Sequence, residues 1–265
     1  MDFAETEDQK MIREMVREFA EDVAGPTCNK RDKEQIAPIE EFKKFAELGF
    51  AGMTIPEQYG GQKLDDISEA IVVEELSRVD PSLGVMIAVH VGLCSMTIAL
   101  SGNEEQKEKY LPKLASGEFL GAYSLSEAGS GTDAAAMVAR ATDDGEHYTL
   151  NGEKMWVTNG TTADLFVLFA KVTDHPDYGK KSHGGVTCFI IEKGFEGFEI
   201  GKKEDKLGIR SSDTCTLILN ECKVPKANVL GDVGKGFPIA MNALDNSRIG
   251  IAAQGLGIAQ GAYAV

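Results

Sequence analysis

The first 120 residues carry apolar side chains at the spacing of α-helices. Thr6 and Gln9 form the pattern of a capping box, which predicts a helix that starts there. Apolar residues then recur three or four positions apart, at Met11, Ile12, Met15, Val16 and Phe19. This spacing brings them to one side of an α-helix. We therefore expect an amphipathic helix whose apolar side is buried in a core.

Two more helical segments follow. The first is expected to stop at Gly49, and its apolar positions are Phe42, Phe45 and Leu48. The second is expected to begin at Asp65, whose carboxylate can cap it, and its apolar positions are Ile67, Ile71, Val72 and Leu76.

Residues 83–100 are apolar on nearly every side of the predicted helix, so we expect this helix to be buried. No apolar stretch is expected to be long enough to span a bilayer. His90 lies within the helix and is expected to be a hydrogen-bonded core residue rather than a ligand. Asn103 and Gln106 then begin a charged helix. Together these segments predict a helical domain over residues 1–120.

From about Gly121 to Leu230 the apolar pattern alternates with the period of a β-strand. Asn151-Gly152 separates HYTL from EKMWVT, which predicts a hairpin turn. Three further runs are rich in β-branched and aromatic residues: LFVLFAKV, GVTCFIIE and TCTLIL. We expect residues 121–232 to form an antiparallel β-barrel or sandwich domain. The charged stretch GKKEDKLGIR is expected to be a solvated loop, with a contact for an electron-transfer partner as the alternative.

Beyond Gly234 the helical period returns and continues to Val265 without a terminating signal. We expect residues 233–265 to be the first helix of a third, helical domain. The predicted fold class is therefore α+β with several domains.

Composition narrows the function. The formal net charge of −15 argues against a general nucleic-acid surface, which needs positive charge. The N-terminus resembles neither a signal nor a transit peptide. The five cysteines are scattered and lack metal-ligand spacing, so we expect reduced thiols and no metal site. A cytoplasmic location without membrane attachment is the expectation.

Two segments carry the candidate chemistry: YSLSEAGSGTD at positions 123–133 and KMWVTNG at positions 154–160. They combine small residues, hydroxyls and an indole, which can line a flat redox cofactor. Gly129 and Gly131 lack the third glycine of a dinucleotide fingerprint and no buried parallel strand leads into them, so a Rossmann fold is not expected. Each segment alone could also have a purely structural role: its small residues could form a turn, its tryptophan could lie in the core, or its threonine could end a strand.

The two segments in this order, with the helical and β regions around them, closely resemble the acyl-CoA dehydrogenase family of flavoenzymes along the whole chain. The resemblance implies FAD as cofactor and α,β-dehydrogenation of an acyl-CoA thioester, in which a carboxylate removes the α proton and hydride leaves to the flavin. The implied cofactor-binding residues are Tyr123, Leu125, Ser126, Gly131, Thr132, Trp156, Val157 and Thr158. The implied substrate-binding residues are Thr132, Asp245 and Arg248.

Asp245 and Arg248 are three positions apart on the last predicted helix, so they share a side of it. A surface ion pair is an equally good interpretation of that spacing. Some family members carry the catalytic glutamate just before the arginine, where this chain has Ser247. Others carry it late in the third domain, beyond this sequence, so we assign no catalytic base. Glu127 and Asp133 lie near the first segment, but the resemblance gives neither of them that role.

The resemblance is strongest to short-chain, butyryl-CoA dehydrogenases. It implies an electron-transferring flavoprotein as electron acceptor and a homotetramer for the full-length protein. Two alternatives stay open: an acyl-CoA oxidase, and a catalytically silent module that binds flavin or acyl-CoA. The missing base favours the expectation that this chain by itself is inactive.

Overall fold

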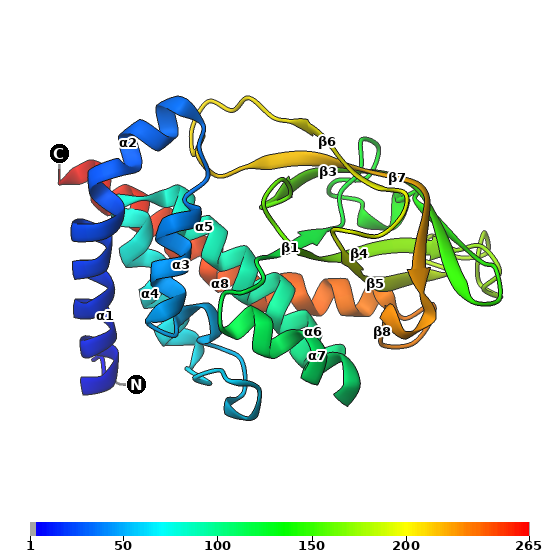
Figure 1. Cartoon of the computed structure of the whole chain (residues 1–265), viewed down its shortest axis with the longest axis horizontal. Coiled ribbons are helices and arrows are strands. Elements are labelled where there is room, and N and C mark those ends of the chain that lie inside the picture. The colour runs from blue at the N-terminus through cyan, green and yellow to red at the C-terminus, as the bar shows by residue number, and fades with distance from the viewer. Residues whose placement is uncertain (1–3, 265) are drawn as a thin grey trace.

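The computed structural model describes residues 4–264, in which a group of helices lies beside a β-sheet and one long helix runs along both (Figure 1). The helical region contains α-helices and two π-helical segments, η1 and η4. Their bounds are α1 Glu7–Phe19, η1 Ala20–Ala24, α2 Gly25–Glu34, α3 Ile39–Glu47, α4 Asp66–Val79, α5 Pro81–Ala88, η4 Val89–Ser95, α6 Met96–Ser101 and α7 Glu104–Ala115. Short 3-10 turns, η2 Phe50–Gly52 and η3 Glu57–Tyr59, connect α3 to α4.

Helix α1 begins as predicted. Thr6 accepts from the backbone N–H of Gln9, and the Gln9 side chain accepts from the backbone N–H of Thr6. The expectation that the whole apolar stripe is buried was wrong, because the side chains of Met11 and Met15 are 57% and 48% exposed. The helix faces α4 with Val16 and also with arginines, so ion pairs occupy part of the interface.

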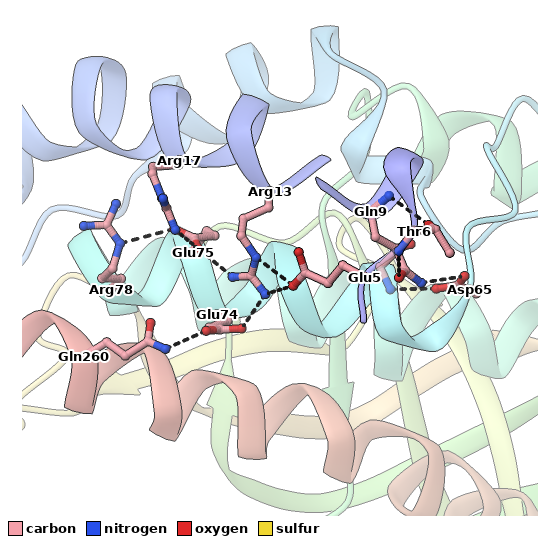
Figure 2. Close-up of polar contacts among 11 residues, drawn as sticks. Glu5, Thr6, Gln9, Arg13, Arg17, Asp65, Glu74, Glu75, Arg78 and Gln260 are labelled. Carbon is pink, nitrogen blue, oxygen red and sulfur yellow. Dashed lines mark hydrogen bonds and ion pairs between the residues drawn. The ribbon is translucent and has the colours of Figure 1, made fainter. Parts of the chain in front are cut away.

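Glu75 on α4 is the centre of these ion pairs and is fully buried (Figure 2). It accepts from Arg13 at 2.6 Å, from Arg17 at 2.8 Å and from Arg78 at 3.2 Å. A buried carboxylate is stable only when charged donors replace its lost water, and three guanidinium groups do so here. The cluster fixes α1 to α4.

Helices α5 and α6 and the π-helical segment η4 form one continuous buried helical run. Pro81–Ser101 has the length and apolar composition of a membrane span, contrary to our expectation that no such stretch exists. It is a core element of this fold, because 72% of its most apolar window is buried. His90 is fully buried and hydrogen-bonded as predicted, since its Nε2 lies 3.1 Å from the Leu114 carbonyl oxygen and its Nδ1 accepts from Gly121 N–H at 3.0 Å.

The β region is one open sheet with the order β6-β7-β3-β2-β4-β5-β8, and β1 pairs with β4. It is mixed rather than purely antiparallel, because β1 and β2 both run parallel to β4. It does not close into a barrel, because its end strands β6 and β8 do not pair with each other. The strand bounds are β1 Gly121–Ser124, β2 Arg140–Asp143, β3 His147–Thr158, β4 Leu165–Val172, β5 Val186–Glu192, β6 Phe198–Lys203, β7 Thr214–Pro225 and β8 Val229–Leu230.

The predicted hairpin turn at Asn151-Gly152 was wrong. Strand β3 runs through both residues, and its pairing with β7 shifts register between Leu150 and Gly152, as at a β-bulge. A Cβ at Gly152 would lie 2.8 Å from Ala139, so the close approach of the residue just before β2 requires glycine there. The turn between β2 and β3 lies instead around Gly145, which has a φ of 100°.

Helix α8, Gly236–Tyr263, joins the two regions (Figure 1). Its first residue packs on β5, since a Cβ at Gly236 would lie 2.6 Å from the Thr187 carbonyl carbon. Further along, Gly257 and Gly261 allow its backbone to lie directly against α4. Part of its surface is apolar and exposed, at Ile249, Ile251, Leu256 and Ile258.

The charged stretch at 201–210 was expected to be a solvated loop, but it makes hydrogen bonds to the helical region. The Arg210 N–H donates to Asp32 at 2.7 Å, and Lys203 Nζ donates to the Gln35 carbonyl oxygen at 2.5 Å. The stretch therefore rests on the end of α2, although the side chain of Leu207 is fully exposed.

Candidate active site

A cavity of about 560 Å³ lies where η4, the segment after β1, the end of β3 and the first half of α8 meet. This volume is in the range of small-molecule and cofactor sites. The cavity collects residues from both candidate segments and from α8. Its lining consists of Val89, Leu93, Tyr123, Leu125, Ser126, Gly131, Thr132, Asp133, Ala134, Ala135, Met155, Trp156, Thr158, Phe237, Met241, Leu244 and Arg248.

The first segment reaches the cavity because β1 ends at Ser124 and the chain then turns. Glu127 and Ser130 exchange backbone hydrogen bonds of 2.9 and 3.1 Å, which form this turn. Tyr123 closes one side: its hydroxyl donates to the Ala240 carbonyl oxygen at 3.4 Å, and burial raises its pKa well above the ordinary value. The segment thus borders the cavity with polar groups beside an aromatic ring.

The second segment reaches the cavity through an irregularity in β3. Its pairing with β7 shifts register between Lys154 and Val157, and Trp156 has a φ of 60°. A left-handed conformation is unusual for a bulky residue and costs on the order of 1–3 kcal/mol. The result is an indole that is 59% exposed at the cavity, while the neighbouring Val157 is buried.

The polar groups of the cavity are free to bind a ligand. Within residues 4–264, the side-chain hydroxyls of Ser126, Thr132 and Thr158 have no hydrogen-bond partner. A Cβ at Gly131 would meet no protein atom within 4 Å, so this edge of the cavity is open. Free hydroxyls, an exposed indole and an open glycine edge fit a flavin, which presents a flat ring with polar edges and an anionic diphosphate.

Helix α8 lines the cavity with Phe237, Met241, Leu244 and Arg248, which are three or four residues apart and therefore on one side of the helix. Arg248 Nε donates to Asp245 at 3.2 Å, so the two residues share a face as predicted and form an ion pair. Both side chains are about three-quarters exposed, at 75% and 73%, and only Arg248 borders the cavity. The pair is thus open to a competing anion.

Two carboxylates near the first segment differ in their availability. Glu127 is buried and paired: it lies 2.7 Å from Lys154 Nζ and accepts from the backbone N–H groups of Val138 and Ala139. It cannot serve as a base without breaking this arrangement. Asp133 lines the cavity and stands at the N-cap position of the 3-10 turn Ala134–Ala136, but its side chain makes no capping hydrogen bond. Ser247 donates to the Leu244 carbonyl oxygen at 3.1 Å.

The structure brings together most of the predicted site residues. Of the cofactor set, all but Val157 line the cavity, and of the substrate set Thr132 and Arg248 do. Sequence analysis missed the apolar lining from α8, although the repeated spacing of residues 237, 241, 244 and 248 is a signal that could have found it. It also missed Lys154, whose partner is far away in the sequence. Among the described residues, no cluster of metal-ligating side chains occurs, and all five cysteines are free thiols.

A second cavity of about 530 Å³ lies beside the first and is strongly basic. Arg140, Lys171, Lys180 and Lys181 line it together with Tyr178 and Ser182. Segment 133–138 borders both cavities, and Lys171 Nζ donates to the Ala135 carbonyl oxygen at 3.0 Å. Lys181 pairs with Asp177 at 2.9 Å. The side chains of Arg140 and Lys180 make no hydrogen bond or salt bridge within the described part of the chain, although, besides the hydrogen bond from Lys181, the charge of Lys180 helps to lower the pKa of Asp177.

Comparison with known proteins agrees with this arrangement. Residues 6–118 match the acyl-CoA dehydrogenase N-terminal domain, and residues 122–222 match the acyl-CoA dehydrogenase middle domain. A curated relative from Clostridium acetobutylicum, acyl-CoA dehydrogenase, short-chain specific, is 49% identical over 263 residues, which cover 99% of this chain and 68% of the relative. Across similar curated relatives the chain spans between 60% and 69% of their length.

Solved structures give the same result. Butyryl-CoA dehydrogenase from Megasphaera elsdenii superposes with a TM-score of 0.94 at 42% identity, covering 100% of this chain and 69% of that one. A structure described as an electron transferring flavoprotein of Acidaminococcus fermentans has a TM-score of 0.95 at 48% identity, covering 100% and 68%. Acyl-CoA dehydrogenase complexed with FAD from Bacillus anthracis has a TM-score of 0.87 at 38% identity, covering 96% and 43%. The chain therefore belongs to the acyl-CoA dehydrogenase family.

Proposed function

We propose that the protein of which this chain forms the N-terminal, middle and first C-terminal helical parts binds FAD and dehydrogenates short-chain acyl-CoA thioesters between Cα and Cβ. One observation carries the proposal: a single cavity gathers the free hydroxyls, the exposed indole and an arginine from three separate parts of the chain. Two ligands must meet in such a reaction, and the cavity has walls from both the sheet and the helices.

The cavity residues on the sheet side have different proposed roles toward FAD. FAD, when bound, would supply the oxidising chemistry, because protein side chains do not accept hydride. Ser126 and Thr158 would donate hydrogen bonds to the polar edge of the flavin ring, and Trp156 would lie beside it. Gly131 and Thr132 would approach the diphosphate, since glycine permits close approach and a hydroxyl can donate to an anionic oxygen.

The substrate would contact the opposite wall. Val89, Leu93, Met241 and Leu244 offer apolar surface for a short acyl chain. The basic cavity beside segment 133–138 offers cations to the phosphate groups of CoA, and the formal net charge of −15 makes such a local cluster necessary for a polyanionic ligand. Arg248 would exchange Asp245 for an oxygen of the substrate.

The proton-transfer step lacks a suitable group within the described residues. Asp133 is the one carboxylate among the residues that line the cavity, and it is on the solvent-exposed turn near Thr132. Glu127 is buried in an ion pair, and Ser247 cannot accept the α proton unaided. We therefore propose that residues 4–264 bind ligand without completing the reaction, and that a longer form of the protein supplies the base.

The partners implied by the resemblance remain part of the proposal. These are an electron-transferring flavoprotein as acceptor, a homotetramer for the full-length protein and a cytoplasmic location. A silent binding module is the second candidate, and the burial of Glu127 favours it for the 265-residue chain itself. An oxidase would differ by rapid reoxidation of its flavin in air.

Binding and proton transfer can be tested separately. The chain has a single tryptophan, Trp156, so its fluorescence reports on the cavity alone. FAD is expected to quench it, and butyryl-CoA to change the spectrum of the bound flavin. Exchange of the butyryl-CoA α protons in D2O, followed by NMR, is expected to stay at the uncatalysed rate. Absence of any FAD-dependent quenching would overturn the cofactor assignment, whereas rapid exchange would show that a base lies within these residues.

A further inference from the structure

Two oppositely charged residues from the two candidate segments meet inside the protein. Lys154 is fully buried and Glu127 is 5% exposed, and their charged atoms are 2.7 Å apart. Burial lowers the pKa of Lys154, and Glu127 counteracts this effect. Burying two charges costs several kcal/mol per ion and is tolerated only when both are well hydrogen-bonded. Such a pair therefore requires a well-defined surrounding structure.

The pair is held by backbone groups on both sides. Glu127 accepts from Val138 N–H at 2.6 Å and from Ala139 N–H at 3.1 Å, where the chain enters β2. Lys154 also donates to the Leu125 carbonyl oxygen at 3.0 Å. The turn after β1 and the chain that enters β2 are thus both tied to one position in β3.

A backbone hydrogen bond next to the pair extends this connection to the cavity. Met155 N–H donates to the Ser126 carbonyl oxygen at 2.9 Å. Ser126 and Met155 both line the cavity and directly adjoin Glu127 and Lys154 in sequence. The position of Ser126 relative to Trp156 is consequently fixed by contacts that begin at the ion pair.

The same position determines where the indole points. In a regular strand, residues 154 and 156 would lie on one face, because side chains alternate. Here Lys154 and Val157 are both buried, Trp156 is exposed, and the register of β3 against β7 shifts between them. The extra residue of this bulge turns Trp156 from the buried face to the cavity, and Lys154 is the last anchored residue before it.

We infer that Glu127 and Lys154 are positioning residues, which hold the bulge at Met155 and Trp156 and keep the indole next to Ser126 at the cavity. This role needs no bound ligand. It rests on the proposed function only where the cavity is taken to be the flavin site. Neither residue touches a ligand in this assignment, and each acts through its neighbour.

The test uses Trp156 fluorescence in the cofactor-free 265-residue chain. Lys154→Met removes the charge and the donor, so the bulge is expected to relax toward regular alternation. The acrylamide quenching constant should fall, and the emission maximum should move to shorter wavelength, because the indole turns inward. Lys154→Arg keeps a positive donor and should restore part of both values. Unchanged quenching in a folded Lys154→Met chain would overturn the inference.

A matched control separates positioning from general loss of stability. Arg31 and Asp80 form another buried ion pair, in the helical region. Arg31→Met should lower the melting temperature and leave Trp156 quenching at the parent value. If Lys154→Met does not fold, Glu127→Gln keeps the side-chain size while it removes the negative charge. It should shift the quenching in the same direction, and parent-like quenching in that variant would also overturn the inference.

FAD titration then distinguishes this inference from the proposed function. If the parent chain binds FAD, Lys154→Met should bind it more weakly, and Arg31→Met should bind it like the parent. If the parent does not bind FAD while Lys154→Met still shifts the quenching of Trp156, the positioning role stands and the cofactor assignment fails.

Discussion

Arg13 of α1 donates to Glu75 of α4 at 2.6 Å, and Glu75 is completely buried, whereas Arg13 is 21% exposed (Figure 2). The arginine therefore brings its charge into the interface while part of its side chain stays in water. The neighbouring Glu74 accepts from Gln260 of α8 at 2.7 Å, so the same turn of α4 binds both the first and the last helix.

Replacing Glu75 by Gln should destabilise the fold by about 3 kcal/mol, because three charged hydrogen bonds lose their acceptor charge. Urea unfolding followed by circular dichroism measures this difference. Arg17→Gln is the control: Arg17 is 48% exposed, so its loss should cost less than about 1 kcal/mol. Similar losses in the two variants would contradict the central role of the buried carboxylate.

Acid should destabilise the protein through His90. Burial lowers the pKa of His90 from 6.5 to about 4, so the folded state favours the neutral ring. This stabilisation is complete above pH 6.5 and is lost as the pH falls toward about 4, where the loss amounts to about 3 kcal/mol. His90→Gln should flatten unfolding free energy against pH in this window. If the free energy of unfolding of His90→Gln depends on pH as steeply as that of the parent, groups other than His90 cause the pH dependence.

Arg248→Ala should weaken binding of butyryl-CoA and leave FAD affinity unchanged, because Arg248 lies on the α8 wall of the cavity and its loss removes a charged hydrogen bond of about 1.5–3 kcal/mol. Asp245→Asn frees the same arginine from its ion pair and should strengthen binding. Both dissociation constants come from spectral titration. If the parent, Arg248→Ala and Asp245→Asn all bind butyryl-CoA with the same affinity, Asp245 and Arg248 are only a surface ion pair.

Thr158→Val should shift the absorption spectrum or the reduction potential of bound FAD, since it removes a free hydroxyl at the cavity and keeps the side-chain shape. Thr161→Val is a useful comparison, because the Thr161 hydroxyl bonds to Asp213 and does not line the cavity. A spectrum and potential identical to those of the parent in Thr158→Val would remove this residue from the flavin contacts.

The double substitution Arg140→Gln and Lys180→Gln should weaken binding of butyryl-CoA but not of butyryl-pantetheine, which lacks the nucleotide phosphates. Each lost phosphate contact should also reduce the salt dependence of binding, because fewer ions are released. Lys43→Gln and Lys44→Gln on α3 change the net charge equally and serve as the control. If the double substitution weakens the binding of both ligands equally, the phosphate groups of CoA do not bind in the basic cavity.

Local signals in the sequence predicted much of the fold. The caps at Thr6 and Asp65 are present, because they involve residues three positions apart. Asn151-Gly152 misled the analysis, since a glycine needed for close approach to Ala139 looks the same in sequence as a glycine needed for a turn. The parallel pairing of β1 and β2 with β4 has no local signal either.

In the candidate site, too, some features have a signal in the sequence and others depend on the fold. The residue types at Ser126, Thr132 and Trp156 indicated a cofactor site through their resemblance to a family. The contact between Glu127 and Lys154 spans 27 positions and depends on the fold, so periodicity could not predict it. The resemblance also placed Val157 in the cofactor set, but the side chain of Val157 is buried and does not line the cavity.

The glycine-lined contact of α8 with α4 has a consequence for biosynthesis. Gly250 faces Glu69, and Gly257 and Gly261 face the end of α4, but α8 emerges from the ribosome about 180 residues after its partner. Protein synthesis adds about 5–20 residues per second, so the side of α4 that α8 covers stays exposed for on the order of 10–40 s. During translation, the nascent helical region is therefore a natural client for a chaperone until α8 arrives.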